Sequence, residues 1–321
     1  MRFVVRVTRV PINMLDLAII GAPRAGTSTL FAWLNAHPAV QGSTPKETYF
    51  FMDAEHPLTV RQEKRGEPTV HTAGLSAFDT FFDESADGLR LEATTHHYYQ
   101  DTAQEMFARS EPKPHVLFVV RQPAHRIRSS FLFTKHNRGR IDPGLTFNRY
   151  VDVLLDGDPS VLSQHYHSDS SLYIAKRELE LSTYVVWLER WEERLGTEHV
   201  HPLVFERFVE ESRRVVVQIC RTLGIDPSFY EKRSVSAKGE TTLVRSPTLQ
   251  RLAYEVGTRI PDGRLKQAVK SLYRWIQVQD ASASDASGTD RGVEQLKEYF
   301  EPRNERLAQH SNLDLSSWCR P

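Results

Sequence analysis

A stretch rich in glycine and hydroxyl side chains, GAPRAGTSTL at residues 21–30, has the residue types of a phosphate-binding loop. Gly21 and Gly26 have the spacing of a P-loop, and Ser28 stands where such a loop has its hydroxyl. Backbone N–H groups in this kind of turn, together with the positive end of the following helix, bind an anion whatever the side chains are. Thr27 replaces the lysine of a nucleoside triphosphatase, and Arg24 brings a guanidinium that fits phosphate or sulfate oxygens. The stretch indicates an anion site, and a plain strand-to-helix connection is the structural alternative.

A second candidate anion site follows the apolar run HVLFVV at residues 115–120, which ends in Arg121. An ATPase or GTPase usually has a magnesium-binding Asp at such a strand end, whereas a cation there repels a metal and attracts a phosphate. A helix is expected to begin at Pro123, and it supplies Ser129 with Arg126 nearby. Two anion sites at strand ends without a metal ligand between them suit a nucleotide with phosphates at two distant positions.

Strand patterns that alternate with helical patterns are expected to position these residues. Predicted strands cover residues 15–21, 89–94, 115–120 and 199–205, and continuous helical patterns cover residues 172–196 and 206–224. We expect an α/β fold of the P-loop NTPase-like type, three-layered, with a central parallel sheet flanked by helices. The chain, residues 1–321, is predicted to form a single domain, with an N-terminal extension at 1–13 and a flexible loop at 279–291.

Composition excludes several classes of function. Lys plus Arg and Asp plus Glu each number 41, so no global basic field points to nucleic acid. The two cysteines form no disulfide framework or zinc pattern, and no metal is predicted. The N-terminus lacks the continuous apolar stretch of a signal peptide, and no apolar run reaches the about 18 residues of a transmembrane helix. A soluble, cytoplasmic protein is expected.

Four motifs in order carry a resemblance to a known family. GAPRAGTSTL resembles the 5'-phosphosulfate-binding loop, and VVRQPAHRIRSSF the 3'-phosphate-binding strand and helix, of sulfotransferases that use 3'-phosphoadenosine 5'-phosphosulfate (PAPS). Arg121, Pro123, Arg126 and Ser129 match the pattern of the branch with heparan sulfate and bacterial small-molecule enzymes, with Gln122 in place of its Asp. HPAVQGSTPKETYFF resembles the segment of that branch's catalytic glutamate, and LKEYFEPRNERL with LDLSSW its C-terminal end.

This resemblance implies metal-independent in-line transfer of a sulfuryl group from PAPS to a hydroxyl or amine, with 3'-phosphoadenosine 5'-phosphate (PAP) as product. It implies that Glu47 is the general base, for which an ordinary surface pair with Lys46 is the alternative. Arg24 is expected to act as a charge clamp, and Lys46 either assists the leaving group or only solubilises. The implied cofactor-binding residues are Arg24, Ala25, Gly26, Thr27, Ser28, Thr29, Arg121, Ser129, Lys238, Gly239 and Arg245.

The acceptor is the least defined part of this prediction. LEATTHHYY, at residues 91–99, resembles a family stretch in which a Lys follows the Glu; Glu92 is kept, but Ala93 replaces that Lys. Glu92, His96 and His97 are candidate acceptor residues. The histidines either orient the acceptor or serve as an alternative base, and a structural role is the other alternative for them. The predicted acceptor is a small molecule, a lipid or a carbohydrate, and O- versus N-transfer and oligomeric state stay open. The alternatives are a P-loop small-molecule kinase with a degenerate loop and a catalytically inactive nucleotide-binding relative.

Overall fold

The computed structural model describes residues 14–231, 243–244, 278–279 and 290–319. It divides into two compact units: unit 1 comprises Met1–Val120 and Val186–Ala237, and unit 2 comprises Arg121–Val185 and Lys238–Pro321. The single-domain organisation stays a prediction. The expected extension at residues 1–13 lies outside the described residues, as does the expected loop at 279–291 apart from its ends.

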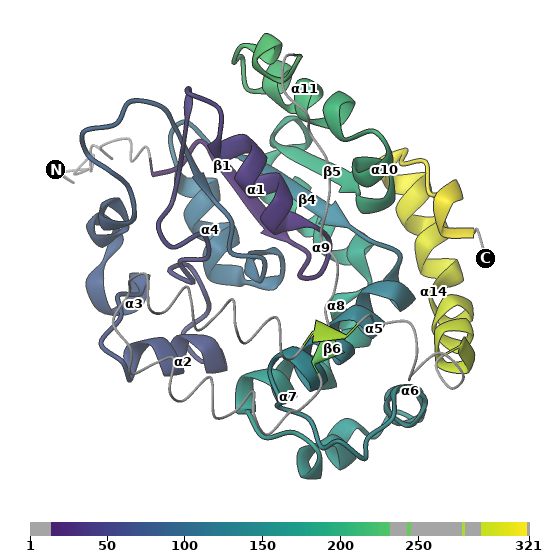
Figure 1. Ribbon diagram of the computed structural model, residues 1–321. Coiled ribbons are helices and arrows are strands. Elements are labelled where there is room, and N and C mark those ends of the chain that lie inside the picture. The colour runs from purple at the N-terminus through teal and green to yellow at the C-terminus, as the bar shows by residue number, and fades with distance from the viewer. Residues whose placement is uncertain (1–13, 232–242, 245–277, 280–289, 320–321) are drawn as a thin grey trace, which may run out of the picture. The chain divides into compact units, whose positions relative to one another are not determined.

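Unit 1 is built on a parallel sheet of five strands in the order β2-β3-β1-β4-β5 (Figure 1). The strands are β1 (Leu17–Gly21), β2 (Val40–Gly42), β3 (Leu89–Glu92), β4 (His115–Val120) and β5 (Val200–Val204). Every residue of β1 is buried, as expected for the central strand of a sheet covered on both faces. In register, Leu17 of β1 lies opposite Leu91 of β3 on one side and His115 of β4 on the other.

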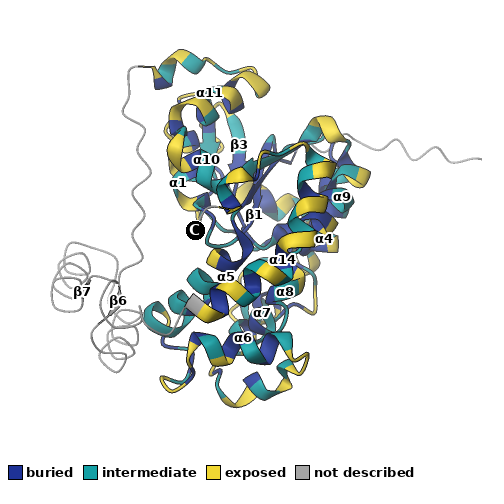
Figure 2. Ribbon diagram, turned by 90° about the vertical axis from the view of Figure 1, so that its right-hand side faces the viewer, coloured by how far each residue is buried: buried dark blue, intermediate teal, exposed yellow. Residues whose placement is uncertain are grey.

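Helices cover both faces of this sheet (Figure 2). On one face lie α1 (Thr27–Asn35) and α10 (Phe205–Glu210), whose Trp33 and Phe208 rings are 5.0 Å apart between centroids. On the other lie α4 (Asp101–Arg109) and α9 (Tyr184–Leu195), joined by the Phe107 and Trp191 rings at 5.7 Å. These three layers confirm the predicted α/β fold class. The remaining helices and 3₁₀ turns of unit 1 are α2 (Pro57–Glu63), α3 (Val70–Ala73), η1 (Leu75–Phe81), η2 (His97–Tyr99), η5 (Thr197–His199), α11 (Ser212–Thr222) and η6 (Pro227–Tyr230).

The described part of unit 2 is built mainly of helices and includes a short antiparallel pair of strands, β6 (Leu243–Val244) and β7 (Val278–Gln279). Its core contains Phe131, Phe147, Tyr150 and Phe300, which pack α5, α6 and α14 together. The elements are α5 (Pro123–Leu132), the π-helical turn η3 (Phe133–Asn137), α6 (Phe147–Leu155), η4 (Pro159–Gln164), α7 (Asp169–Lys176), α8 (Glu178–Leu181), α14 (Asp290–Ser311) and η7 (Ser316–Cys319).

Two helices that the sequence predicts as continuous are interrupted, so those expectations are wrong. The pattern over 172–196 forms α7, α8 and α9, and the pattern over 206–224 forms α10 and α11. Two of the three breaks, between α8 and α9 and between α10 and α11, have a serine whose hydroxyl donates to the carbonyl oxygen four residues earlier: Ser182 Oγ to Glu178 O at 2.7 Å and Ser212 Oγ to Phe208 O at 3.0 Å. Such bonds compete with the helical ladder, and an apolar periodicity does not report them.

Candidate active site

The glycine-rich turn joins β1 to α1 and leaves the start of the helix without a side-chain cap. Gly26 is the N-cap residue, with φ 77° and ψ 11°, a left-handed conformation that favours glycine. A Cβ atom at Gly26 would lie 2.9 Å from Cε2 of Phe205, so the ring of α10 also excludes a side chain there. An uncapped N-terminus directs backbone donors and the positive end of the helix dipole at whatever binds in the turn. This geometry fits an anion.

The residues of the turn differ in how far they are buried. Ala25 and Thr27 are buried, Arg24, Gly26 and Thr29 are half-buried, and Ser28 is exposed. Arg24 has φ 68°, one of three described non-glycine residues with a positive φ. For such a residue the left-handed conformation costs roughly 1–2 kcal/mol, and strain of this kind concentrates at functional sites. The backbone at Arg24 is therefore held in a conformation that is locally unfavourable for a residue with a side chain.

Glu47 lies in a cluster of hydrogen-bond donors. Its Oε1 atom is 3.0 Å from Lys46 Nζ and accepts from Thr95 Oγ1 at 3.3 Å, and Tyr49 Oη donates to Oε2. Burial raises the pKa of Glu47, but the charges of Lys46 and His96 and the hydrogen bonds from Tyr49 and Lys46 outweigh it and hold the pKa below its ordinary value of 4.5. Glu47 is thus a carboxylate at neutral pH, able to take a proton.

Tyr49 was not among the residues that sequence patterns single out, although it lies two positions after Glu47. It has φ 53°, the second strained non-glycine position in this region, and its N–H donates to Thr94 Oγ1 at 3.0 Å. Its ring stacks on His96 with centroids 6.3 Å apart. The only sign of this role in the sequence is a hydroxyl two residues after the predicted base. The turn that brings the Tyr49 hydroxyl back to Glu47 depends on contacts with residues 92–95, which the local sequence does not show.

The glycine-rich turn and the Glu47 segment lie at the same edge of the sheet. β1 and β3 are parallel neighbours, and they end at Gly21 and Glu92. A Cβ atom at Gly21 would lie 3.1 Å from the carbonyl oxygen of Thr95, the residue whose hydroxyl donates to Glu47. Ligand sites of open α/β sheets occur at this carboxyl edge. The structure thus brings the predicted turn and the predicted base into one region of unit 1.

Lys46 is bound on two sides. Its Nζ donates to Glu47 and, at 3.1 Å, to the carbonyl oxygen of Ala93, and the Ala93 N–H donates to the Lys46 carbonyl oxygen. The pair with Glu47 predicted as the alternative is therefore present, but it lies within a half-buried cluster and is more than an isolated surface contact.

Glu92 and His97 are fully buried, so in this conformation neither can touch an acceptor. Glu92 accepts from the Thr48 N–H at 3.1 Å and from the Thr94 N–H at 2.9 Å, and His97 Nδ1 lies 3.3 Å from its carboxylate. Burial raises the pKa of Glu92, but the charge of His97 and these hydrogen bonds hold the pKa below its ordinary value. The hydrogen bonds from Thr48 to Glu92 tie the end of β3 to the Glu47 segment. His96, in contrast, is half-buried.

In unit 2, Arg121 and Ser129 are both half-buried; Arg121 directly follows the last residue of β4, and Ser129 lies within α5. The side chain of Gln122 caps α5 by accepting from the His125 N–H at 2.8 Å, which is what the family's Asp would do at an N-cap. Arg126 is buried in unit 2, where it forms an ion pair with Glu178. The predicted cofactor residues Lys238, Gly239 and Arg245 lie outside the described residues.

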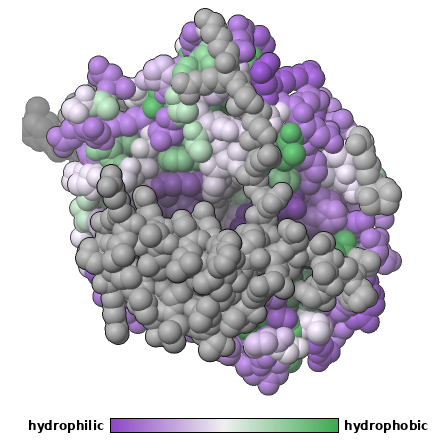
Figure 3. Space-filling view, in the orientation of Figure 1, coloured by the Kyte–Doolittle hydropathy of each residue, from purple (hydrophilic) through white to green (hydrophobic). Residues whose placement is uncertain are grey.

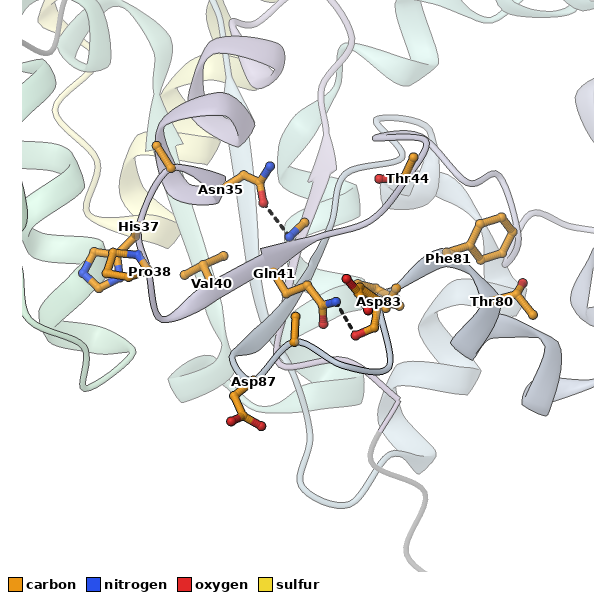
Figure 4. A pocket seen from close by; sticks show the side chains of 14 residues that line it. Asn35, His37, Pro38, Val40, Gln41, Thr44, Thr80, Phe81, Asp83 and Asp87 are labelled. Atoms are coloured by element: carbon orange, nitrogen blue, oxygen red, sulfur yellow. Dashed lines mark hydrogen bonds between the residues drawn. The ribbon is translucent and has the colours of Figure 1, made fainter.

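A pocket of about 620 Å³ opens beside the edge strand β2 (Figure 4). Gln41 Nε2 donates to the Asp83 carbonyl oxygen at 2.7 Å, and Asn35 Oδ1 accepts from the Gly42 N–H at 2.6 Å. The Asn35 bond satisfies a donor that an edge strand would otherwise expose. None of the described residues predicted for the site lines this pocket. The hydrogen bonds of Asn35 and Gln41 beside it protect the edge strand β2.

On the face shown in Figure 3, the described residues that are visible are largely hydrophilic, with smaller hydrophobic areas scattered among them. The large hydrophobic side chains exposed among the described residues are Val60, Val186 and Val209. Within the described ranges, no helix has the length and apolar character needed to cross a membrane.

Comparison with known proteins now defines the class. Residues 15–244 match the model of the sulfotransferase domain family, and the chain belongs to that family. A curated relative, the mouse bifunctional heparan sulfate N-deacetylase/N-sulfotransferase 4, is 21% identical over 215 residues, which are 66% of this chain and 22% of that protein. This chain thus corresponds to about a fifth of that relative's length. The resemblance drawn from the motifs is confirmed.

A solved structure shows the same fold. The sulfotransferase from Alicyclobacillus acidocaldarius superposes with a TM-score of 0.64 at 20% identity, covering 95% of this chain and 99% of that one. At this identity the likeness establishes the fold, and sulfuryl transfer follows from membership in the family.

Proposed function

We propose that this sulfotransferase uses PAPS as donor and transfers the sulfuryl group to a hydroxyl or amine without a metal, with Glu47 as general base. The observation that carries the proposal is the Glu47 carboxylate, held ionised by Lys46, Tyr49 and Thr95 at the sheet edge that also holds the uncapped turn of Gly26. PAPS supplies an activated sulfuryl group on a phosphate. A base beside an anion-binding turn is what transfer from such a donor requires.

In the proposed step, a lone pair of the acceptor oxygen or nitrogen forms the bond to sulfur while the bond from sulfur to the bridging phosphate oxygen breaks. The acceptor proton passes to Glu47, and the electron pair of the broken bond leaves on PAP. Arg24 and the backbone donors of residues 25–29 stabilise the charge that develops on the departing phosphate. Arg24 acts as a fixed charge, because a guanidinium does not give up its proton readily.

Lys46 provides a second cation for the same reaction. Ala93 stands where the family pattern has a Lys directed at the acceptor and sulfate, and Lys46 Nζ is bonded to the carbonyl oxygen of that residue. We propose that Lys46 supplies from a neighbouring segment the positive charge that position 93 lacks. Its bond to Glu47 also keeps the base ionised.

Recognition of the 3'-phosphate is proposed for Arg121 and Ser129, on the strength of the motif that contains them, with Lys238, Gly239 and Arg245 as further contacts. The acceptor is proposed to be a small molecule, a lipid or a carbohydrate. Neutral overall charge favours these over a highly sulfated polymer.

Ligand-induced stabilisation tests the donor. PAP at a hundred times its Kd should stabilise the protein by about 2.7 kcal/mol in the presence of EDTA, seen as a raised melting temperature. If ATP with magnesium stabilises the protein and PAP does not, the chain uses its loop as a kinase would and the proposal is wrong.

Turnover of radiolabelled donor across phenols, sugars, amines and lipid alcohols tests the transfer. Glu47→Gln should lower kcat by about 10²–10⁴-fold, the usual worth of a general base, while PAP binds within a few-fold of wild type. Glu67→Gln is the matched control, because Glu67 is an exposed carboxylate of the same unit. Unchanged turnover in Glu47→Gln would remove Glu47 from this role, and PAP binding without turnover by the wild type would identify an inactive relative.

A further inference from the structure

The carboxylate of Glu92 is fully buried, and both of its oxygens accept hydrogen bonds. Oε1 accepts from the Thr48 N–H at 3.1 Å, from the Thr48 hydroxyl at 3.0 Å and from the Thr94 hydroxyl. Oε2 accepts from the Thr94 N–H at 2.9 Å and lies 3.3 Å from Nδ1 of His97. The lowered pKa of Glu92 keeps this group ionised in spite of its burial. Any contribution of Glu92 to the reaction therefore passes through the residues that bind it.

Thr48 and Thr94 connect Glu92 to the backbone of residues 49 and 50. Because an ionised carboxylate only accepts, each threonine hydroxyl uses its one hydrogen to donate to Glu92. The hydroxyl oxygens are then directed to accept. Thr94 Oγ1 accepts from the Tyr49 N–H at 3.0 Å, which is the first of these bonds. Thr48 Oγ1 accepts from the Phe50 N–H at 3.3 Å, which is the second. Glu92 and the two threonines thus form one hydrogen-bonded group, the Glu92 cluster.

The turn at Tyr49 brings donors to the proposed base. Tyr49 has φ 53°, a conformation that is locally unfavourable for a residue with a side chain, and the bond from its N–H to Thr94 helps to hold it there. In this conformation Tyr49 Oη donates to Glu47 Oε2. Thr95, the residue after Thr94, donates to Glu47 Oε1 at 3.3 Å. Both donors therefore belong to segments that the Glu92 cluster binds.

We propose that Glu92 is a positioning residue, which acts through its two threonines to direct the Tyr49 hydroxyl at the base Glu47. This inference rests on the proposed sulfuryl transfer, in which Glu47 takes the acceptor proton. Because Glu92 is buried, it touches no acceptor in this conformation. Its role is thus one step removed from the acceptor contact that the sequence suggests.

A separate contact holds the start of the Glu47 segment. Lys46 Nζ donates to the carbonyl oxygen of Ala93 at 3.1 Å, and the Ala93 N–H donates to the Lys46 carbonyl oxygen at 3.1 Å. Neither bond involves a side chain of the Glu92 cluster. Loss of the cluster should therefore loosen residues 48–50 while Lys46 stays paired with Glu47.

Thr94→Val is the decisive variant, because it leaves the carboxylate in place. Valine has the shape of threonine, but it removes both the donor to Glu92 and the acceptor of the Tyr49 N–H. Thr94→Ser keeps the hydroxyl and should behave like wild type. Thr59→Val is the matched control: Thr59 is fully buried in the same unit, and within the described part of the chain its hydroxyl has no hydrogen-bond partner.

Glu92→Gln removes the charge at the centre of the cluster and is the second variant. The amide nitrogen of glutamine only donates, and in either orientation it faces a backbone N–H, that of Thr48 at Oε1 or that of Thr94 at Oε2. The variant should release both threonines and reproduce the effects of Thr94→Val on Glu47.

Carboxyl ¹³C chemical shifts, followed against pH in protein labelled at the glutamate side chains, test the cluster without any ligand. The hydrogen bond from Tyr49 is one of the interactions that hold the pKa of Glu47 below its ordinary value against the effect of burial. In Thr94→Val the titration of Glu47 should therefore move to higher pH, whereas Thr94→Ser and Thr59→Val should titrate like wild type. The Glu47 signal is the one lost in Glu47→Gln. An unmoved Glu47 titration in Thr94→Val, or in Glu92→Gln, overturns the proposal.

Kinetics with the best acceptor of the panel test the consequence for transfer. Thr94→Val should lower kcat about ten- to a hundredfold, because a reacting group displaced by about 1 Å can lose about 10²-fold, with a smaller change in KM and an unchanged Kd for PAP. The acid limb of its kcat–pH profile should move to higher pH together with the Glu47 titration. Thr94→Ser should recover most of the loss. Equal kcat in the Val and Ser variants, or a loss of kcat without a shift of the pH profile, refutes the positioning role.

The positioning role and the proposed function fail in different measurements. A wild type that binds PAP but transfers nothing refutes the proposed function, and the Glu47 titration reports the hydrogen bonds of the cluster independently of turnover. An active wild type in which Thr94→Val changes neither the Glu47 titration nor kcat refutes the positioning role alone.

Discussion

Replacing Gly26 with alanine tests whether the turn between β1 and α1 is the anion site. At φ 77° a non-glycine residue costs roughly 1–2 kcal/mol, of which the stiffer unfolded chain of alanine returns about 0.4–1 kcal/mol. The added Cβ would also lie 2.9 and 3.0 Å from two atoms of the Phe205 ring and 3.3 Å from Phe208. Forcing a methyl into a packed site costs typically about 1–3 kcal/mol. The total is about 1–5 kcal/mol.

Gly66 provides the matched control for this substitution. It has φ 72°, nearly the same backbone conformation as Gly26, but a Cβ there would meet nothing within 4 Å. Gly66→Ala should therefore lose only the conformational part, about 1.5 kcal/mol or less. The difference between the two variants, measured by urea denaturation, isolates the contact of the turn with Phe205 and Phe208.

Binding is the decisive measurement for the same pair of variants. Relief of the Phe205 contact moves the backbone of the turn, and so the N–H groups proposed to bind the 5'-phosphate. Isothermal titration with PAP should give a Kd about tenfold or more weaker in Gly26→Ala, and an unchanged Kd in Gly66→Ala. If Gly26→Ala is destabilised as expected but binds PAP like wild type, the turn is only a strand-to-helix connection and the reasoning is wrong.

Three further predictions concern other parts of the chain. Arg24→Lys keeps the charge but loses the forked donor, so kcat should fall about tenfold with PAP binding reduced less; an equally active Lys variant would mean that charge alone suffices. Burial and the neighbouring His115 and His199 lower the pKa of His201 to about 4. The neutral ring of His201 therefore makes its full contribution to stability above about pH 6.5, and this contribution is lost as the pH falls toward 4. Allowing for solvent screening of a half-buried ring, the loss is about 1 kcal/mol, and pH-dependent denaturation should show it in wild type and not in His201→Gln. Glu178→Gln leaves the buried guanidinium of Arg126 without its counter-charge and should destabilise unit 2 by about 3–5 kcal/mol, whereas a neutral result in thermal melts would show that the pair is replaceable.

Local patterns in the sequence were sufficient to predict the central part of the fold. The strand, turn and helix from Leu17 to Asn35 follow from an apolar run, two glycines and a helical repeat, each read from adjacent residues. The fold class and the family followed from repeating that pattern and from four motifs in order. The short edge strand Val40–Gly42 was missed because three residues carry no periodicity, and the breaks at Ser182 and Ser212 depend on single side-chain bonds.

The environment of Glu47 could not be read from the sequence. Thr95, which donates to it, is 48 positions away, and nothing in the spacing connects the two. Likewise His96 and His97 are adjacent and chemically identical, yet one is half-buried beside Tyr49 and the other is fully buried against Glu92. Which of two neighbouring histidines can meet an acceptor depends on the direction of the chain after β3, which only the structure gives.

The lowered pKa of Glu47 bears on how the proposed reaction distributes its catalysis. The same donors that keep the carboxylate ionised, Lys46 and Tyr49, also weaken it as a base, because each hydrogen bond stabilises the charged form. A weak base cannot remove a hydroxyl proton before the acceptor attacks, so proton transfer must accompany bond formation to sulfur. The barrier then depends chiefly on the leaving group, whose charge Arg24 and the turn are proposed to stabilise. Loss of Arg24 altogether, as in Arg24→Ala, should therefore reduce kcat at least as much as loss of the base in Glu47→Gln, and a much smaller effect in single-turnover kinetics would contradict this division of roles.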